Sequence, residues 1–246
     1  MASSGSEIYL SVIIPAYNES SCLGRTLDVA RKFLVDQPFT WQVAVVDDGS
    51  SDQTPHLVQA ISQIDPRVQL LQYPHNRGKG FAVRYGMLHT TGKYRLFMDA
   101  DHSTAIDHIS QFLPLLEADC DIVIASRALA ESEITIHQPK WKELLGKLGN
   151  RWIQWWAVPG INDTQAGFKA FRAQAAEKIF PNLTIDRWGF DVEVLALAKH
   201  YKYKIAEQPI RWVNNPETKV TALAYLQVLR DVMKVRFNIW RNRYPV

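Results

Sequence analysis

The stretch Leu96-Phe97-Met98-Asp99-Ala100-Asp101 decides the fold of this chain. Its three leading apolar residues indicate a buried strand, in which side chains alternate between the two faces with period two. Asp99 and Asp101 therefore point to the same side if the strand continues to Asp101. They lie where the strand ends, and ligands of open α/β sheets bind at that edge. Two carboxylates on one side repel each other unless a cation lies between them, and a hard divalent ion that also holds a diphosphate suits that place.

Length and composition are those of an ordinary globular protein. The chain has 246 residues, 47% of them hydrophobic and 22% charged, and its formal net charge is +3. That charge is too small to indicate a nucleic-acid partner by itself. Cys22 and Cys120 show no metal-ligand spacing, which favours a reducing compartment. Residues 1–7 are expected to be a flexible tail without a signal peptide, and no apolar run reaches the roughly twenty residues of a membrane span.

Strands and helices alternate over the first half of the chain. Strands are expected at residues 8–16, 41–46, 68–72, 96–101 and 121–125. Helices are expected at residues 20–34, 54–62, 81–89 and 106–117, the first of them with Ser20 or Ser21 as its N-cap. This alternation predicts a mostly parallel sheet with helices on both faces.

The pattern changes after Arg127. The elements expected there are a helix at 140–156, a short strand or turn at 170–171, a helix from the 187–193 motif to about residue 200, a strand at 205–213 and an amphipathic C-terminal helix at 221–242. No repeat or interdomain linker is found, so residues 8–246 are expected to form a single domain.

Polar clusters follow several of these strands and should meet along one edge of the sheet. They are Pro15-Ala16-Tyr17-Asn18-Glu19, Asp47-Asp48-Gly49-Ser50, Asp99-Ala100-Asp101 and Arg127. Each alone is compatible with an ordinary turn or surface residue, whereas their convergence favours a nucleotide site in which Arg127 and Lys79 neutralise phosphate. The chain has no P-loop motif and no Gly-x-Gly-x-x-Gly after the first strand, which excludes a P-loop nucleotidase and disfavours a dinucleotide redox enzyme.

Four early motifs and two late ones resemble those of the family 2 glycosyltransferases, which have the GT-A fold. The early motifs are Ser11-Val12-Ile13-Ile14-Pro15-Ala16-Tyr17-Asn18-Glu19, Val46-Asp47-Asp48-Gly49-Ser50, Asn76-Arg77-Gly78-Lys79-Gly80 and Asp99-Ala100-Asp101. The late ones are Asp163-Thr164-Gln165-Ala166-Gly167-Phe168-Lys169 and Arg187-Trp188-Gly189-Phe190-Asp191-Val192-Glu193. The late motifs narrow the resemblance to the polyprenyl-phosphate branch, first the dolichyl-phosphate β-glucosyltransferases and next the dolichyl-phosphate mannose synthases. The resemblance covers about residues 8–213 and implies a Rossmann-like, mixed sheet flanked by helices.

The resemblance implies a donor pocket with a metal site. The residues expected to line the base and the ribose are Pro15, Tyr17, Glu19 and Asp47. Asp48 is expected close to the sugar nucleotide, and Asp99 and Asp101 are expected to hold Mg²⁺ or Mn²⁺ against the diphosphate. Where mannose synthases supply a further ligand, this chain has Ser103.

The resemblance also implies residues that bind phosphate and the acceptor. Arg127, Arg187 and Lys219 are the candidates for the phosphates of donor and acceptor. Asp163 and Gln165 are expected to face the transferred sugar or the acceptor, and Asp163 and Glu193 are candidates to orient the acceptor. Neither carboxylate is assigned as a general base. The residues expected to carry catalysis are Asp99, Asp101, Arg127, Asp163 and Gln165.

The expected reaction is an inverting, metal-dependent transfer of a hexose to a polyprenyl or dolichyl monophosphate, with glucose from UDP-glucose favoured. Such an acceptor needs no strong base, because a phosphate with a second pKa of about 6 is already ionised near neutral pH. The alternatives are a mannose synthase using GDP-mannose and a GT-A enzyme acting on a soluble glycan or a protein. A nucleotidylyltransferase is disfavoured because no glycine-rich loop follows the first strand. A binding module without turnover is disfavoured by the intact Asp99 and Asp101 pair.

Residues 8–127 are expected to form the nucleotide-sugar-binding half, and residues 128–246 the acceptor- and membrane-facing half. Residues 140–156 and 221–242 both mix tryptophan with basic residues. Tryptophan favours the headgroup boundary, and each basic side chain near an anionic surface contributes about 1 kcal/mol. We therefore expect a monotopic surface attached to the cytoplasmic face of a membrane, while ordinary packing helices stay open as the alternative. No nucleic-acid partner is expected, and the sequence leaves the oligomeric state open.

Overall fold

The computed structural model describes residues 7–135, 149–213 and 222–245. A seven-stranded sheet runs through it in the order β3-β2-β1-β4-β7-β5-β8. The strands are β1 (Leu10–Ala16), β2 (Trp41–Asp47), β3 (Val68–Gln72), β4 (Tyr94–Met98), β5 (Ile122–Ser126), β7 (Phe168–Arg172) and β8 (Ile205–Pro209). All pair in parallel except β7, which lies antiparallel between β4 and β5. The prediction of a mixed, mostly parallel sheet is confirmed.

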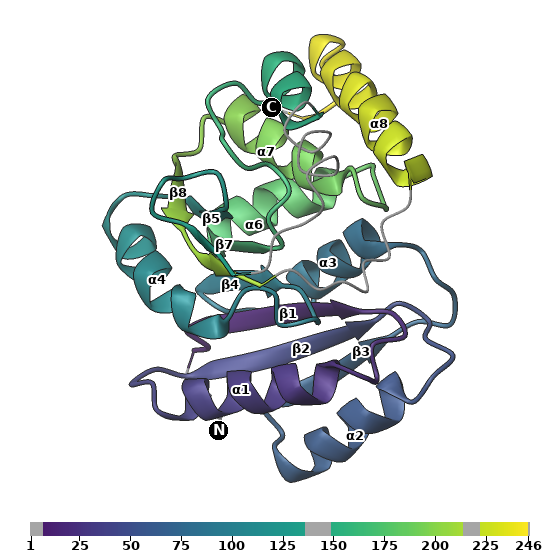
Figure 1. Cartoon of the computed structure of the whole chain (residues 1–246), viewed down its shortest axis with the longest axis vertical. Coiled ribbons are helices and arrows are strands. Elements are labelled where there is room, and N and C mark those ends of the chain that lie inside the picture. The colour runs from purple at the N-terminus through teal and green to yellow at the C-terminus, as the bar shows by residue number, and fades with distance from the viewer. Residues whose placement is uncertain (1–6, 136–148, 214–221, 246) are drawn as a thin grey trace, which may run out of the picture.

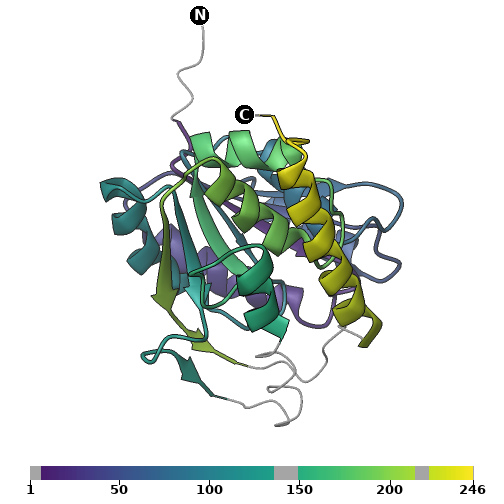
Figure 2. The ribbon, with the colours of Figure 1, turned by 90° about the horizontal axis from the view of Figure 1, so that it is seen from above.

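Helices cover both faces of this sheet (Figure 1). The helices on one face are α1 (Leu23–Val35), α2 (Thr54–Ile64) and α4 (Ile109–Ala118), which follows the short 3-10 helix η1 (Ile106–His108). Those on the other face are α3 (Lys79–Leu88), α6 (Ala173–Ile179), which leads into the 3-10 helix η2 (Phe180–Asn182), and α7 (Phe190–His200). α8 (Ala222–Trp240) packs on α7, and residues 149–156 are helical and lie on this same side of the sheet (Figure 2).

The apolar pattern of the sequence explains these two layers. β1 and β5 are buried along their whole length, because helices cover both faces of a parallel sheet and leave no solvent face. In α1 the buried apolar residues Leu23, Leu27, Ala30 and Leu34 recur with helical spacing on the face toward the sheet. α7 is buried from Phe190 to Ala198, since it lies between the sheet and α8.

The strand that carries the paired aspartates is shorter than predicted. β4 ends at Met98, so Asp99 and Asp101 lie in the turn that follows, and the expectation that they share a face by strand alternation is wrong. The turn is held by two bonds to neighbouring elements. Asp99 N donates to Gly167 O at 3.1 Å, and Thr26 of α1 donates through its hydroxyl to Ala100 O at 2.6 Å. These bonds replace the ladder that would have extended β4.

Three other boundaries differ from the predictions. The N-cap of α1 is Cys22 rather than Ser20 or Ser21, because Ser20 N donates to Asp52 and the Glu19 carbonyl accepts the first amides of the helix. The strand expected at 205–213 is divided at Ile210 into β8 and β9 (Arg211–Trp212), and β9 pairs with the short β6 (Glu133–Ile134). The short strand or turn expected at 170–171 is the five-residue central strand β7.

Parts of some predicted elements lie outside the described residues. These are most of the expected N-terminal tail, residues 140–148 of the helix predicted at 140–156, and Thr221 at the start of the C-terminal helix.

Candidate active site

The loops after β1 and β2 bring the predicted donor residues together. Asn18 N donates to Ser50 Oγ at 2.8 Å, and Ser51 N donates to Asn18 Oδ1 at 2.9 Å, so the two loops are tied side by side. Pro15 pairs in register with Val46 near the end of the first two strands. The other residues predicted to bind the sugar-nucleotide donor lie at the same edge of the sheet. Tyr17 is exposed, Glu19 is half-buried and Asp47 is buried.

Asp48 organises the glycine-bearing loop before α3. Its carboxylate accepts Asn76 Nδ2 at 2.9 Å, Arg77 N at 2.7 Å and Gly78 N at 2.8 Å. Gly78 has φ +109°, and a Cβ there would lie 2.7 Å from Asp186 O and 2.8 Å from Arg187 Cγ. Only glycine fits this position, because of both its φ and the close approach. Asp48 thus fixes the loop that leads to Lys79 and places that loop against the late 187–193 motif.

The paired carboxylates lie beside Lys79, at the first residue of α3. Lys79 Nζ is 2.5 Å from Asp99 Oδ1, and Asp101 Oδ1 accepts Ser103 N at 3.0 Å. Burial and the neighbouring charge of Asp99 raise the pKa of Asp101. Burial acts to lower the pKa of Lys79, but the carboxylates around it, Asp99 first, raise it overall. The two aspartates, called the acidic pair below, thus already attract one cation of the chain, Lys79.

A buried ion pair lies close to Lys79 and the acidic pair. Lys169 of β7 is fully buried, and its Nζ donates to Asp191 Oδ1 and to Ala166 O, both at 2.6 Å. Burial raises the pKa of Asp191, although the positive charges of Lys169 and Lys79 oppose the rise. Because Lys169 also fixes the backbone just before Gly167, it stabilises the segment that accepts the amide of Asp99.

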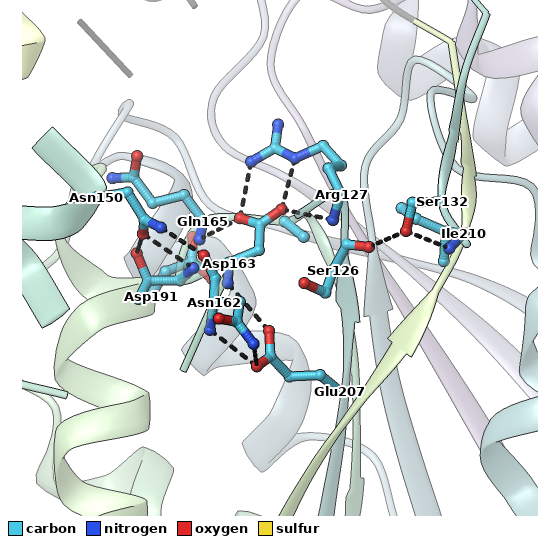
Figure 3. Close-up of polar contacts among 12 residues, drawn as sticks. Ser126, Arg127, Ser132, Asn150, Asn162, Asp163, Gln165, Asp191, Glu207 and Ile210 are labelled. Atoms are coloured by element: carbon cyan, nitrogen blue, oxygen red, sulfur yellow. Dashed lines mark hydrogen bonds and ion pairs between the residues drawn. The ribbon is translucent and has the colours of Figure 1, made fainter. Parts of the chain in front are cut away.

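Half-buried Arg127 and buried Asp163 form a second ion pair at the end of β5 (Figure 3). Asp163 Oδ2 accepts Arg127 N at 2.9 Å and Nε at 2.7 Å, while Oδ1 accepts Nη2 at 2.9 Å. The guanidinium also lies 5.2 Å from the centre of the Trp212 ring. Burial alone would raise the pKa of Asp163, but the charge and hydrogen bonds of Arg127 lower it to about 2. Both oxygens of Asp163 are thus engaged by Arg127, and this carboxylate orients the arginine.

The remaining predicted residues are placed as follows. Gln165 is exposed, and its backbone N donates to Asp163 Oδ1 at 3.2 Å. Arg187 is exposed and lies against the loop at Gly78. Glu193 is fully buried, and its carboxylate accepts hydrogen bonds from Thr184, Ile185 and Tyr244, which contradicts its candidacy to orient the acceptor. Lys219 lies outside the described residues.

The paired aspartates fit a divalent metal that is shared with phosphate. Within residues 7–135, 149–213 and 222–245, no group of three His, Cys, Asp or Glu side chains could hold a metal ion. Mg²⁺ commonly takes one or two carboxylates and completes its shell with water and phosphate oxygens. Burial and the charge of Asp99 raise the pKa of Asp101, and a divalent cation held by both carboxylates would oppose that rise.

Three residues of the site were not predicted from the sequence. Lys169 and Asp191 are part of the late motifs but had no assigned role, because the sequence around neither residue identifies the other as its partner. Gly167 was quoted in the same way. Gly167 lies so close to the Asp99 carboxylate that a Cβ there would be 1.9 Å from Asp99 Oδ2. The sequence around Gly167 does not indicate this contact.

The sequence model of the family described as glycosyl transferase family 2 matches residues 11–180. The chain belongs to glycosyl transferase family 2. It is therefore a glycosyltransferase, and the early motifs along the sheet edge are those of the family.

Curated relatives match nearly the whole of this glycosyltransferase. A dolichyl-phosphate beta-glucosyltransferase of Dictyostelium discoideum is 37% identical over 251 residues, which cover 95% of the chain and 77% of the relative. The protein of the same name from Homo sapiens is 34% identical over 242 residues, covering 92% of the chain and 74% of the relative.

Solved structures share the GT-A fold. Glucosyl-3-phosphoglycerate synthase of Mycobacterium tuberculosis, in complex with Mn²⁺, UDP and glucosyl-3-phosphoglycerate, superposes with a TM-score of 0.70 at 16% identity, over 94% of this chain and 80% of that one. A mannosyltransferase of Pyrobaculum calidifontis in complex with GDP-Man and Mn²⁺ has a TM-score of 0.63 at 22% identity, over 94% and 65% of the two chains. At these identities the likeness shows the fold, and the predicted fold class is confirmed.

Proposed function

We propose that this enzyme transfers glucose from UDP-glucose to a dolichyl or other polyprenyl monophosphate, with inversion at the anomeric carbon. The observation that carries the proposal is the match, over nearly the whole chain, to relatives named dolichyl-phosphate beta-glucosyltransferase. The acidic pair of Asp99 and Asp101 supports it, because a nucleotide-sugar donor brings a diphosphate that a shared metal ion can hold.

In the proposed reaction an oxygen of the acceptor phosphate attacks the anomeric carbon of glucose. A new carbon–oxygen bond forms while the bond to the diphosphate breaks, and UDP leaves with the electron pair. Asp99 and Asp101 would hold Mg²⁺ or Mn²⁺, which supplies charge stabilisation for the leaving diphosphate. Lys79 and Arg127 add positive charge at the same edge of the sheet. The acceptor is already ionised near neutral pH, so none of the carboxylates has to act as a base.

The proposal divides the chain between its two substrates. Residues 8–127 bind the donor, whose base and ribose lie between the loops after β1 and β2, lined by Pro15, Tyr17, Glu19 and Asp47. Residues 128–246 bind the acceptor, with Gln165, Arg187 and Lys219 toward its phosphate and the transferred sugar. The close packing of Gly78 against Arg187 supports a site in which the two halves meet.

The test of this function is a transfer assay with labelled donors. With UDP-[¹⁴C]glucose, polyprenyl phosphate in detergent and Mg²⁺ or Mn²⁺, label should appear in a lipid from which mild acid releases free glucose. GDP-[¹⁴C]mannose serves as the comparison donor, and a soluble glycan as the comparison acceptor. Label that reached only the soluble glycan, or came only from GDP-mannose, would contradict the proposal.

The proposed acceptor is a lipid, so the enzyme needs access to a membrane surface. Within its described residues no helix is both long and apolar enough to span a bilayer. Trp155 is 77% exposed and Trp240 of α8 is 74% exposed, and exposed Phe237 of α8 lies beside Arg241, which follows the end of that helix. Exposed aromatic and basic side chains on helices support peripheral attachment at the cytoplasmic face. Trp152 and Trp156 pack against the core, so Trp155 is the tryptophan of its segment that is free to enter lipid.

We expect the enzyme to float with anionic vesicles at low salt. Trp155→Ser and Trp240→Ser together should weaken flotation, because they remove two large apolar side chains from the lipid boundary. Ile64→Ser is the matched control, since Ile64 is 79% exposed on α2, which covers the face of the sheet opposite to that of residues 149–156. Retained flotation in the double tryptophan variant would place the membrane surface elsewhere. Donor binding should be unchanged in both the double tryptophan variant and Ile64→Ser.

A further inference from the structure

Glu207 of β8 holds the loop that contains Asp163. Its Oε2 accepts Asn162 N at 2.8 Å and Asn162 Nδ2 at 2.9 Å, and its Oε1 accepts Asp163 N at 3.0 Å. Figure 3 shows the Glu207 carboxylate beneath this loop, on the side away from Arg127. Both of its oxygens are therefore used to fix two successive residues of the loop to the sheet.

The same loop is held from its other side by the helical segment 149–156. Asn150 Oδ1 accepts Thr164 Oγ1 at 2.8 Å and Thr164 N at 3.4 Å, while its Nδ2 donates to Asn162 O. Thr164 is fully buried. The backbone of residues 162–164 is thus clamped between Asn150 and Glu207.

The clamped loop presents Asp163 to Arg127. The backbone N and the guanidinium of Arg127 bond to the Asp163 carboxylate. An arginine side chain is flexible, and holding its planar head in one orientation before a substrate arrives lowers the entropic cost of binding phosphate. A shift of Asp163 would move or release the guanidinium.

We propose that Glu207 and Asn150 are positioning residues for Arg127, acting through the 162–164 loop and Asp163. The inference rests on the proposed role of Arg127 in binding substrate phosphate. Neither residue was a predicted site residue, and neither contacts Arg127 in the described hydrogen-bond network. Their effect on catalysis passes through Asp163.

Glu207→Gln is the decisive substitution. Its amide nitrogen must face a backbone or side-chain N–H in either orientation, so at least one bond to the loop is lost while size is kept. We expect kcat/KM to fall about tenfold in the wild-type background, as for a lost hydrogen bond to a charged group. In the Arg127→Lys background the same substitution should change kcat/KM less than about twofold, because residues that act as a unit are not additive. Asn150→Ala should behave in the same way.

Asp121→Asn is the matched control. Asp121 is a half-buried carboxylate whose Oδ2 accepts Lys204 N at 2.8 Å, just before β8, and it has no bond to the loop. A purely structural effect of loosening β8 should appear in this variant too. Equal loss from Glu207→Gln in the wild-type and Arg127→Lys backgrounds would overturn the inference. No loss from Arg127→Lys itself would instead overturn the proposed phosphate role of Arg127.

A spectroscopic measurement tests the inference without turnover. The Nε–H of Arg127 donates to Asp163 at 2.7 Å, so its ¹H–¹⁵N resonance should exchange slowly with water. The resonance is assigned by its absence in Arg127→Lys. We expect Glu207→Gln and Asn150→Ala to speed this exchange at least about fivefold, as opening of the ion pair becomes easier, and Asp121→Asn to leave it unchanged. An unchanged Arg127 resonance in both loop variants would overturn the inference, whatever the outcome of the transfer assay.

Discussion

Asp99→Ala should lower the rate of glucose transfer by about a thousandfold or more, because a metal ion that stabilises the leaving diphosphate contributes several kcal/mol to the transition state. The fold should be nearly unaffected. Asp99 follows the end of β4, its side chain is 32% exposed, and its ion pair with Lys79 lies at the edge of the sheet. The measurement is kcat with saturating UDP-glucose and Mg²⁺, together with the melting temperature of each protein.

Asp119→Ala is the control for this prediction. Asp119 also pairs with a lysine, Lys204, but it is exposed and precedes β5, so it lies at the edge of the sheet opposite to the one where β4 ends at Asp99. Its loss should leave both transfer and the melting temperature close to those of the wild type. Wild-type turnover of Asp99→Ala in Mg²⁺ would refute the proposal that the acidic pair holds a metal ion against the donor diphosphate.

The elements of the first half of the fold could be predicted because their signals are local. The buried strands β1, β2 and β5 are continuous apolar runs, and α1 repeats its buried leucines at helical spacing. The end of β4 could not be predicted in this way. It is set by bonds from Thr26 of α1 and from Gly167, which lie far away in the sequence.

The antiparallel strand β7 illustrates the same limit in the sheet. Its sequence Phe168-Lys169-Ala170-Phe171-Arg172 contains a lysine at its second position, which argues against a strand buried on both faces. Lys169 is nevertheless fully buried, because Asp191 and the carbonyl of Ala166 satisfy its ammonium group. A partner that lies on α7 is supplied by the tertiary fold, and no pattern within β7 reveals it.

The sequence predicted which residues belong to the candidate site, but it did not predict which of them pair with one another. Asp99, Asp101, Lys79 and Arg127 all follow strands or lead into a helix at one edge, as the motifs indicated. Only the structure shows that both carboxylate oxygens of Asp163 accept hydrogen bonds from Arg127, because the two residues lie 36 positions apart in the sequence. Glu207 had no signal at all, because its partners Asn162 and Asp163 contact it only across the sheet edge.

Gly167→Ala should displace Asp99 of the acidic pair without unfolding the protein. A Cβ at Gly167 would lie 1.9 Å from Asp99 Oδ2 and 2.3 Å from its Cγ, so the carboxylate must leave its place. Gly167 does not have the positive φ of Gly49 and Gly78, so alanine at this position causes no backbone strain, and the contact with Asp99 is its main effect. The damage is therefore confined to Asp99 and its turn.

We expect Gly167→Ala to weaken the binding of Mn²⁺ at least about tenfold and to lower transfer at least about a hundredfold, since displacement of a ligand by about 1 Å is enough to cost such factors. Mn²⁺ binding is measured by electron paramagnetic resonance with UDP present, and transfer by the labelled-glucose assay. The melting temperature should fall by only a few degrees, as for a change that adds one methyl group next to a half-exposed side chain.

Gly149→Ala is the matched control, because no atom lies within 4 Å of a Cβ built at Gly149. It makes the same chemical change in the helical segment 149–156 and should leave Mn²⁺ binding and transfer at wild-type levels. If Gly167→Ala bound Mn²⁺ as tightly as Gly149→Ala, Asp99 would not be a metal ligand in this enzyme. The pair of variants thus tests the metal site through a residue that carries no charge and cannot itself coordinate a cation.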